Sequence, residues 1–308
     1  MHDTLNTVDR GKRKPVFGRI VRCPSRLSFL PPDVRILYAR CIGRAWRRLN
    51  KRSIIHYVPN IGLMKLNPGD LVGNRLLFYE IWEPIISRFV REHATGTEGA
   101  TAVDIGANIG YYTLMFSRLV GSRGAVYAIE PAPVIRKLLE ENVALNHLSN
   151  VTPVAFGISS RCEVRRFHYN TGSNLGASGF GEVYTEEKLE DGCLELRRLK
   201  DVMRVEDMTR TMIIKIDVEG MEYPVLRDLL DNLPSFPKLG IVLAELRFDG
   251  RGVMDSLVAE FKQRGFAIYA IPNAYEHAFY AAPANESPQR VQHLPPGQHD
   301  VALVRPAL

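Results

Sequence analysis

The sequence predicts an α/β fold: a mostly parallel sheet with helices on both faces, preceded by an N-terminal α/β extension. From residue 100 onward, short apolar runs alternate with segments of helical periodicity, which is typical of such a sheet. The first of these runs leads into a glycine-rich turn where a helix begins. Hydrophobic residues make up 45% of the 308, and no apolar run reaches the roughly 18–20 residues of a membrane span.

In the N-terminal third, the periodicity predicts a helix over 35–48 with Ile36, Leu37, Ile42 and Trp46 toward one side. Residues 53–66 read as short strands broken by Pro59 and Gly62. A helix is expected over 75–93, interrupted at Pro84. The loop at 93–100 is the candidate boundary. We therefore expect three units: a basic leader (1–52), a cap segment (53–95) and a main domain (96–308).

The main domain is predicted to alternate strands and helices to its end. Strands are expected at 100–105, 125–129, 151–156, 212–218, 240–245, 266–271 and 301–304, and helices at 111–119, 134–146, 222–230 and 252–263. The remaining stretches, 157–211 and 272–298, read as irregular insertions that carry substrate specificity.

Positive charge is concentrated at the start of the chain. Residues 1–52 contain 14 Lys or Arg and three acids, a net charge of +11, whereas the remainder has 26 basic and 31 acidic residues. Two interpretations stay open: a solubilising leader, or an arm that docks an anionic partner such as a membrane surface, a carrier protein or nucleic acid.

The cysteines and the N-terminal residues indicate in which cellular compartment the protein is expected. Cys23, Cys41, Cys162 and Cys193 are scattered without a CxxC pair, so neither a zinc site nor a disulfide framework is expected. Residues 1–22 lack the apolar core of a signal peptide, and a cytoplasmic location is therefore expected.

The most informative segment is the turn in Val103-Asp-Ile-Gly-Ala-Asn-Ile-Gly110. Gly106 allows a sharp turn and a close ligand, and Gly110 allows the helix to pack closely on the strand. Asn108 stands where a dinucleotide fingerprint has its second glycine, and Asp104 would repel a pyrophosphate. The pattern therefore disfavours NAD and favours a cationic nucleoside without phosphate, S-adenosylmethionine.

A second carboxylate fits this hypothesis. Glu130 ends the next predicted strand, 24 residues after Gly106, where an acid can accept both ribose hydroxyls. The alternative is a tight turn followed by a helix cap.

The predicted strand over 212–218 is unusually charged. Lys215, Asp217 and Glu219 alternate onto one face, and Asp217 and Glu219 fall at its carboxyl end, where open α/β sheets bind ligands. Lys215 is expected to neutralise a carboxylate. Glu245, near the end of the following strand, is expected to face the same crevice. The alternative is a purely structural ion-pair cluster.

These segments, with Ile129-Glu-Pro131, Ile214-Lys-Ile-Asp-Val-Glu-Gly-Met-Glu222 and Tyr79-Glu-Ile-Trp-Glu-Pro84, resemble the FkbM family of S-adenosylmethionine-dependent methyltransferases. The resemblance covers roughly residues 79–270. It implies a seven-stranded Rossmann-like sheet whose last strand is antiparallel, and methylation of a hydroxyl in natural products, sugars or lipids. It also implies that Glu130 holds the ribose and that the methionine end of the cofactor is lined by Asp104, Gly106, Asn108 and Gly110. Asn174 matches a recurrent polar position on the substrate side.

For the chemistry, in-line methyl transfer to an alcohol needs a general base. Asp217 or Glu219 is the expected base, with Lys215 orienting it, and His168 is the alternative. Glu83 is a possible cofactor or substrate contact. No dedicated metal cage is expected, although Asp217 with Glu245 would suit Mg²⁺. The competing classes are an NAD-linked oxidoreductase and a non-catalytic binding module.

Overall fold

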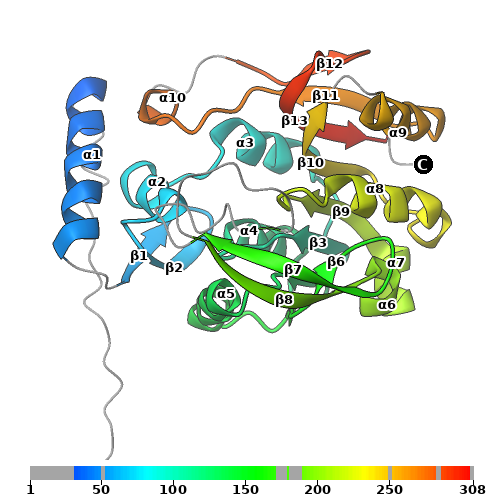
Figure 1. Cartoon of the computed structure of the whole chain (residues 1–308), viewed down its shortest axis with the longest axis horizontal. Helices are drawn as coiled ribbons and strands as arrows, with labels where there is room; N and C mark the ends of the chain where they lie inside the picture. Colours follow the sequence, from blue (N-terminus) through cyan, green and yellow to red (C-terminus); the bar gives the residue numbers. More distant parts are fainter. Residues whose placement is uncertain are drawn as a thin grey trace, which may run out of the picture.

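The computed structural model describes residues 31–49, 53–170, 179, 189–248, 252–281 and 286–305. Within these residues the centre is an eight-stranded sheet of order β12-β11-β13-β10-β9-β3-β4-β5 (Figure 1). Its strands are β3 (Thr101–Ile105), β4 (Ala125–Ile129), β5 (Val151–Val154), β9 (Thr211–Ile216), β10 (Ile241–Phe248), β11 (Ala267–Ile271), β12 (Gln289–Val291) and β13 (Gly297–Val304). The Rossmann-like α/β prediction is confirmed.

Five neighbouring strands, β10-β9-β3-β4-β5, run parallel, whereas β13 is antiparallel to both β10 and β11. This matches the antiparallel last strand that the resemblance implies. The strand count differs, because the three-residue β12 pairs with the outer edge of β11 and adds an eighth strand. It comes from the stretch 272–298, which is therefore not entirely irregular. Pairing covers an edge that would otherwise expose unpaired backbone groups.

Helices cover both faces of the sheet, and each face has its own apolar core. Neighbouring residues in a strand serve opposite cores: Ala102 belongs to one and Val103 to the other, as strand alternation requires. The first core includes residues of α2 (Leu71–Tyr79), α3 (Pro84–His93), α4 (Tyr111–Val120) and α5 (Pro133–Leu145); the second includes residues of α6 (Leu199–Val202), α7 (Val205–Arg210), α8 (Glu222–Asp231), the 3₁₀ helix Leu233–Ser235 and α9 (Val253–Gln263). In the described ranges, no helix has the length and apolar character that crossing a bilayer requires.

One predicted helix differs in its bounds, and one stretch was assigned wrongly. The helix expected over 75–93 with an interruption at Pro84 is two helices, α2 and α3; the interruption is confirmed, but it already begins at Glu80, because Glu80 and Glu83 adopt left-handed backbone conformations. Pro84 is the first residue of α3, a position that needs no backbone N–H. The stretch 157–211 is regular where it is described: β6 (Gly157–Ile158), β7 (Glu163–Asn170) and β8 (Leu189–Arg197) form a second, three-stranded sheet.

The N-terminal hairpin of β1 (Ile54–Val58) and β2 (Gly62–Leu66) is attached to α5 by two asparagine side chains. Asn146 exchanges two hydrogen bonds with the backbone of Leu63. Asn142, fully buried, accepts from Lys65 N at 2.6 Å and donates to Ile109 O at 2.8 Å. The Asn142 amide therefore links this hairpin to the glycine-rich turn.

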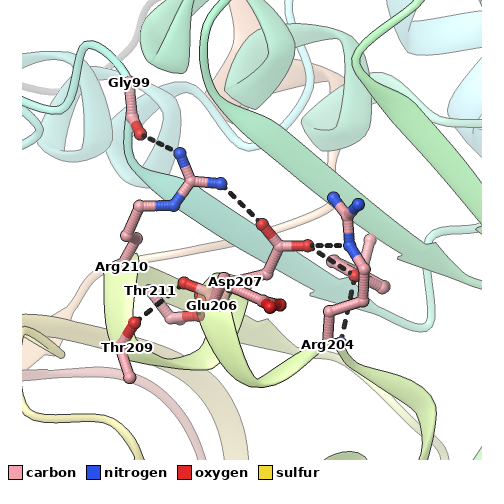
Figure 2. A network of polar contacts seen from close by, with 8 residues as sticks. Gly99, Arg204, Glu206, Asp207, Thr209, Arg210 and Thr211 are labelled. Atoms are coloured by element: carbon pink, nitrogen blue, oxygen red, sulfur yellow. Dashed lines mark hydrogen bonds and ion pairs between the residues drawn. The ribbon is translucent and has the colours of Figure 1, made fainter.

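The buried Asp207 anchors helix α7 at the end of the sheet where β3 and β9 begin (Figure 2). Its carboxylate accepts hydrogen bonds from the Tyr127 hydroxyl at 2.8 Å, Arg204 Nε at 2.8 Å and Arg210 Nη2 at 2.7 Å. Arg210 also donates to the Gly99 carbonyl just before β3. Because β9 starts directly after α7, this network fixes where β9 enters the sheet.

Candidate active site

Two adjoining pockets lie at the carboxyl ends of β3 and β9, the point at which successive strands are added to opposite sides of β3. Open α/β sheets bind ligands at this kind of topological switch point. Both pockets share Gly106, Asn108, Asp217 and Glu219. The inner pocket is further lined by Leu71, Val72, Trp82, Asp104, Ala107, Ile109, Tyr111, Tyr112, Lys215, Glu245, Tyr275 and Gln298, and the outer pocket by Glu130, Pro131, Ile135, Phe167, Gly179 and Val218.

The glycine-rich turn forms the floor between the two pockets. Gly106 has φ +81°, and a Cβ there would lie 1.8 Å from the backbone oxygen of Asp217, so only glycine fits. Asn108 also has a positive φ, 49°, and its side chain accepts from Ile109 N at 2.8 Å. The sequence predicts that Gly110 allows close packing on the strand. The nearest neighbour of this glycine is instead Leu139 of α5.

Glu130 is buried at the end of β4 and lines the outer pocket. Its two oxygens accept from the backbone N–H groups of Asn108 and Ala132, each at 3.0 Å. Burial raises the pKa of this carboxyl group to about 7, although the two N–H donors oppose the shift. A carboxylate oxygen has more than one lone pair, so Glu130 can still accept from a ribose hydroxyl.

Lys215 donates to Asp217 Oδ2 at 2.6 Å, which confirms the expected neutralisation of a carboxylate. Burial alone would disfavour the charged ammonium group, but surrounding carboxylates, Asp217 first, raise its pKa above the usual value. Asp104, opposite Lys215 in the strand register, is buried and accepts from Thr113 Oγ1 at 2.6 Å. Burial raises the Asp104 pKa as well.

The acids after β9 and on β10 complete the inner pocket. β9 ends at Ile216, so Asp217 and Glu219 reach the pocket from the following loop and not from the strand itself. Glu219 lies at the solvent-accessible rim; desolvation by the pocket walls and then repulsion from Asp217 raise its pKa to about 7. Glu245 lies within β10, which continues to Phe248, and its side chain accepts from Gln298 Nε2.

Glu83 stands one layer behind the inner pocket. Its carboxylate accepts from the Tyr112 hydroxyl at 2.8 Å and the Tyr275 hydroxyl at 3.4 Å, and both of these tyrosines line the pocket. Burial raises the Glu83 pKa to about 7. The rings of Trp82 and Tyr275 are stacked with centroids 5.4 Å apart. Glu83 is therefore placed to act on a ligand through the two tyrosines.

The remaining predicted residues divide between those outside the described structure and those away from the pocket. Asn174 lies outside the described residues. His168 lies on β7 in the three-stranded sheet and lines neither pocket, although its neighbour Phe167 lines the outer one. Among the described side chains, no group of three or more His, Cys, Asp or Glu residues is arranged to hold a metal ion.

Sequence reasoning missed the aromatic wall. Trp82 precedes Glu83, which is the residue of this segment predicted as a contact, and Tyr275 lies in the stretch 272–298, which is predicted to be an irregular insertion. The structure brings Tyr275 to the pocket because Arg75 holds its carbonyl oxygen with hydrogen bonds of 3.1 and 2.5 Å. In the sequence, the available signal was the polar pair Asn74 and Arg75 within the mostly apolar segment 71–79.

Among the described residues, the lining has one lysine, already paired, and a surplus of carboxylates. A phosphate ligand would meet this surplus without a compensating cation, whereas an ammonium or sulfonium group is attracted to it. The glycine-rich turn exposes its backbone to the pocket, and the Glu130 carboxylate can accept hydrogen bonds there. This arrangement fits S-adenosylmethionine and defines a nucleoside-binding, Rossmann-like methyltransferase site.

Comparison with known proteins agrees. The model of the methyltransferase FkbM domain matches residues 104–268. Methyltransferase sdnD of Sordaria araneosa is 32% identical over 236 residues, which is 65% of this chain and 90% of that protein. Hexuronic acid methyltransferase AglP of Haloferax volcanii is 28% identical, over 51% of this chain and 63% of that protein. A crystal structure of methyltransferase FkbM from Methylobacillus flagellatus has a TM-score of 0.44 at 14% identity, covering 76% of this chain and 52% of that one.

The chain belongs to the FkbM family of methyltransferases. Its cofactor is S-adenosylmethionine, and the oxidoreductase alternative is set aside.

Proposed function

We propose that this methyltransferase transfers the methyl group to a hydroxyl oxygen of a sugar, lipid or natural product, with a carboxylate at the end of β9 as general base. The observation that carries the proposal is the position of Asp217 and Glu219, which line both pockets. A base is needed because an alcohol must lose its proton as its oxygen attacks carbon. The sulfonium of the cofactor supplies an already activated leaving group.

Of the two carboxylates, Glu219 is the better base. Asp217 is paired with the Lys215 ammonium at 2.6 Å, so one of its two oxygens is already engaged. Within the described part of the chain, no lysine or arginine forms an ion pair with Glu219, and its pKa of about 7 suits proton transfer at neutral pH. We therefore assign proton acceptance to Glu219 and assign orientation of the acceptor and of the cofactor's positive end to the Lys215–Asp217 pair.

The pocket walls suggest what the acceptor carries. The Trp82–Tyr275 stack offers a flat apolar surface beside the hydrogen-bonding groups Glu245 and Gln298. Flat apolar surfaces flanked by carboxylates and amides suit ring compounds bearing several hydroxyl groups. The hexuronic acid methyltransferase relative is consistent with a sugar acceptor. We propose Glu245 and, through the tyrosines, Glu83 as substrate-side residues, and Asn174 keeps that proposed role.

The test is transfer of label from methyl-tritiated S-adenosylmethionine to small-molecule and glycolipid fractions of a cell extract, followed by isolation of the labelled product. An O-methyl ether in the product supports the proposal, and an N-methyl or C-methyl product contradicts it.

Two substitutions address the base. Glu219→Gln is expected to lower turnover by at least 100-fold with less than a fivefold change in cofactor affinity. Asp217→Asn is expected to lower both. Glu206→Gln, an exposed carboxylate of α7 at the opposite end of the sheet, is the matched control. If Glu219→Gln turned over as fast as the control, Glu219 would lose the role.

A further inference from the structure

Helix α1 (Pro32–Leu49) is attached to the rest of the protein by one face only. That inner face contains the buried Ala39 and Gly43 and contacts α2 and α10 (His277–Ala281). Gly43 lies against the Asn74 side chain, where a Cβ would be 2.8 Å from the amide nitrogen, and Arg35 donates to the Ala281 carbonyl at 2.8 Å. Figure 1 shows α1 at the edge of the molecule beside α2.

The outer face of α1 has apolar side chains in solvent. Val34 and Leu37 are exposed by 45% and 63%, and their spacing of three residues puts them on one side of the helix. The neighbouring Tyr38 is 43% exposed and packs the edge of its ring against Phe78 of α2, with ring centroids 5.9 Å apart. The sequence pattern had placed Leu37 with the inner residues Ile36 and Ile42, and this is wrong. Leu37 is rotated away from them by the helical period and faces solvent.

A row of arginines borders this apolar stripe. Arg40, Arg44 and Arg48 are exposed and four residues apart, so they project from one side of α1 next to Leu37. Within the part of the chain that the structure describes, no ion pair joins any of them to a carboxylate. The outer face therefore combines apolar contact area with unpaired positive charge.

We propose that the outer face of α1 docks this protein on the surface of an anionic lipid bilayer. A helix that lies in the interface inserts its apolar side chains while its arginines contact lipid phosphates and carboxylates. Charge complementarity supports this occupant: residues 1–52 carry +11 while the remainder of the chain carries −5, so the field orients the N-terminal end toward an anionic surface.

A bilayer fits this face better than nucleic acid. A phosphate backbone is bound by cations and hydrogen-bond donors, and such contacts make no use of an exposed leucine and valine. At an interface the same side chains gain by leaving water. The proposal does not depend on which acceptor the active site methylates.

The test is sedimentation of the full chain with vesicles of phosphatidylcholine alone and of phosphatidylcholine with phosphatidylserine. We expect at least tenfold tighter binding to the vesicles that contain phosphatidylserine, weakened by added salt. The triple variant R40Q/R44Q/R48Q is expected to lose at least tenfold, and Leu37→Ser several-fold. Matched controls are Arg264→Gln and Val253→Ser, exposed residues of the same types on or next to α9. Both should bind as the unmodified chain does.

Circular dichroism melting of each variant shows that the fold is kept. Equal binding to both kinds of vesicle, or phosphatidylserine binding unchanged in the triple variant, would overturn the proposal. Duplex DNA and polyglutamate serve as competing probes, and tighter binding to either than to the anionic vesicles would overturn the lipid assignment. If the protein failed to bind S-adenosylhomocysteine or to transfer methyl groups, the proposed function would be contradicted, but the expected vesicle binding would stay the same.

Discussion

Replacing Glu130 with Gln tests the cofactor site most directly. If Glu130 accepts both ribose hydroxyls, the substitution keeps the shape of the outer pocket but removes the charge. A hydrogen bond to a charged acceptor contributes about 1.5 kcal/mol more than one to a neutral acceptor. Two such bonds give about 3 kcal/mol, or roughly a 100-fold weaker dissociation constant for S-adenosylhomocysteine. Isothermal titration calorimetry measures this directly, because that product does not turn over.

The pH dependence of S-adenosylhomocysteine affinity provides a second test of Glu130. Burial raises the Glu130 pKa to about 7, so the ligand-free protein at pH 6 holds this group mostly protonated. Binding that requires the ionised form must then expel the proton, and affinity falls as pH drops below 7. One pH unit on either side of that pKa gives a roughly tenfold weaker affinity at pH 6 than at pH 8.

Glu219 titrates in the same range, so the informative quantity is the difference between the profiles of the unmodified chain and of Glu130→Gln. Glu206→Gln, far from the pocket, controls for a general effect of removing a carboxylate. The reasoning is refuted if Glu130→Gln binds S-adenosylhomocysteine within threefold of the control, or if its affinity keeps the full pH dependence of the unmodified chain.

Three further substitutions probe the supports of the site. Gly106→Ala places a Cβ 1.8 Å from the Asp217 oxygen at a φ that costs an alanine about 1–2 kcal/mol, so calorimetry should show S-adenosylhomocysteine affinity reduced more than tenfold. Asp207→Asn should lower the free energy of unfolding by about 2 kcal/mol in urea at pH 7. Burial opposes the ionised Asp207, but its hydrogen bonds hold its pKa below the usual value, so this contribution exists above about pH 4 and disappears as pH falls through the folded pKa; no loss at pH 7 would contradict this. Asn142→Ala leaves the Ile109 carbonyl without its hydrogen-bond donor and should lower the free energy of unfolding by about 1–3 kcal/mol. An unchanged urea midpoint would argue against a stabilising link between the hairpin and the glycine-rich turn through Asn142.

Most of the sheet was predictable because its signals are local. The strand Ala125–Ile129 was predicted residue for residue, and the other parallel strands to within about three residues, because apolar runs bounded by turn residues carry their own boundaries. The second sheet was not predicted, since β7 and β8 are mostly polar and pair with each other across intervening chain. The interruption between α2 and α3 was predicted at Pro84, but its start at Glu80 was not, because non-glycine residues such as Glu80 and Glu83 rarely adopt positive φ.

In the candidate site, too, residues with a local sequence signal were predicted and residues placed by long-range contacts were not. Asp104, Glu130 and Asp217 were found because each directly ends or follows a short apolar run, and the carboxyl ends of parallel strands meet at one edge of the sheet. Tyr275 was not predicted, because its place in the pocket depends on the hydrogen bonds that Arg75, 200 residues earlier in the chain, donates to its carbonyl oxygen.

The surplus of carboxylates in this pocket favours a sulfonium nucleoside over a dinucleotide. Several buried acids around one lysine repel one another, and the protein tolerates them because Glu83 and Glu130 have pKa values raised to about 7 and are partly protonated at neutral pH. A cationic ligand relieves that repulsion, whereas a pyrophosphate would add to it. The unfavourable electrostatics of the ligand-free pocket are thus the source of its selectivity. Neutralising a single acid should weaken binding of the cationic cofactor without opening the pocket to NADH, since the other carboxylates still oppose the phosphates.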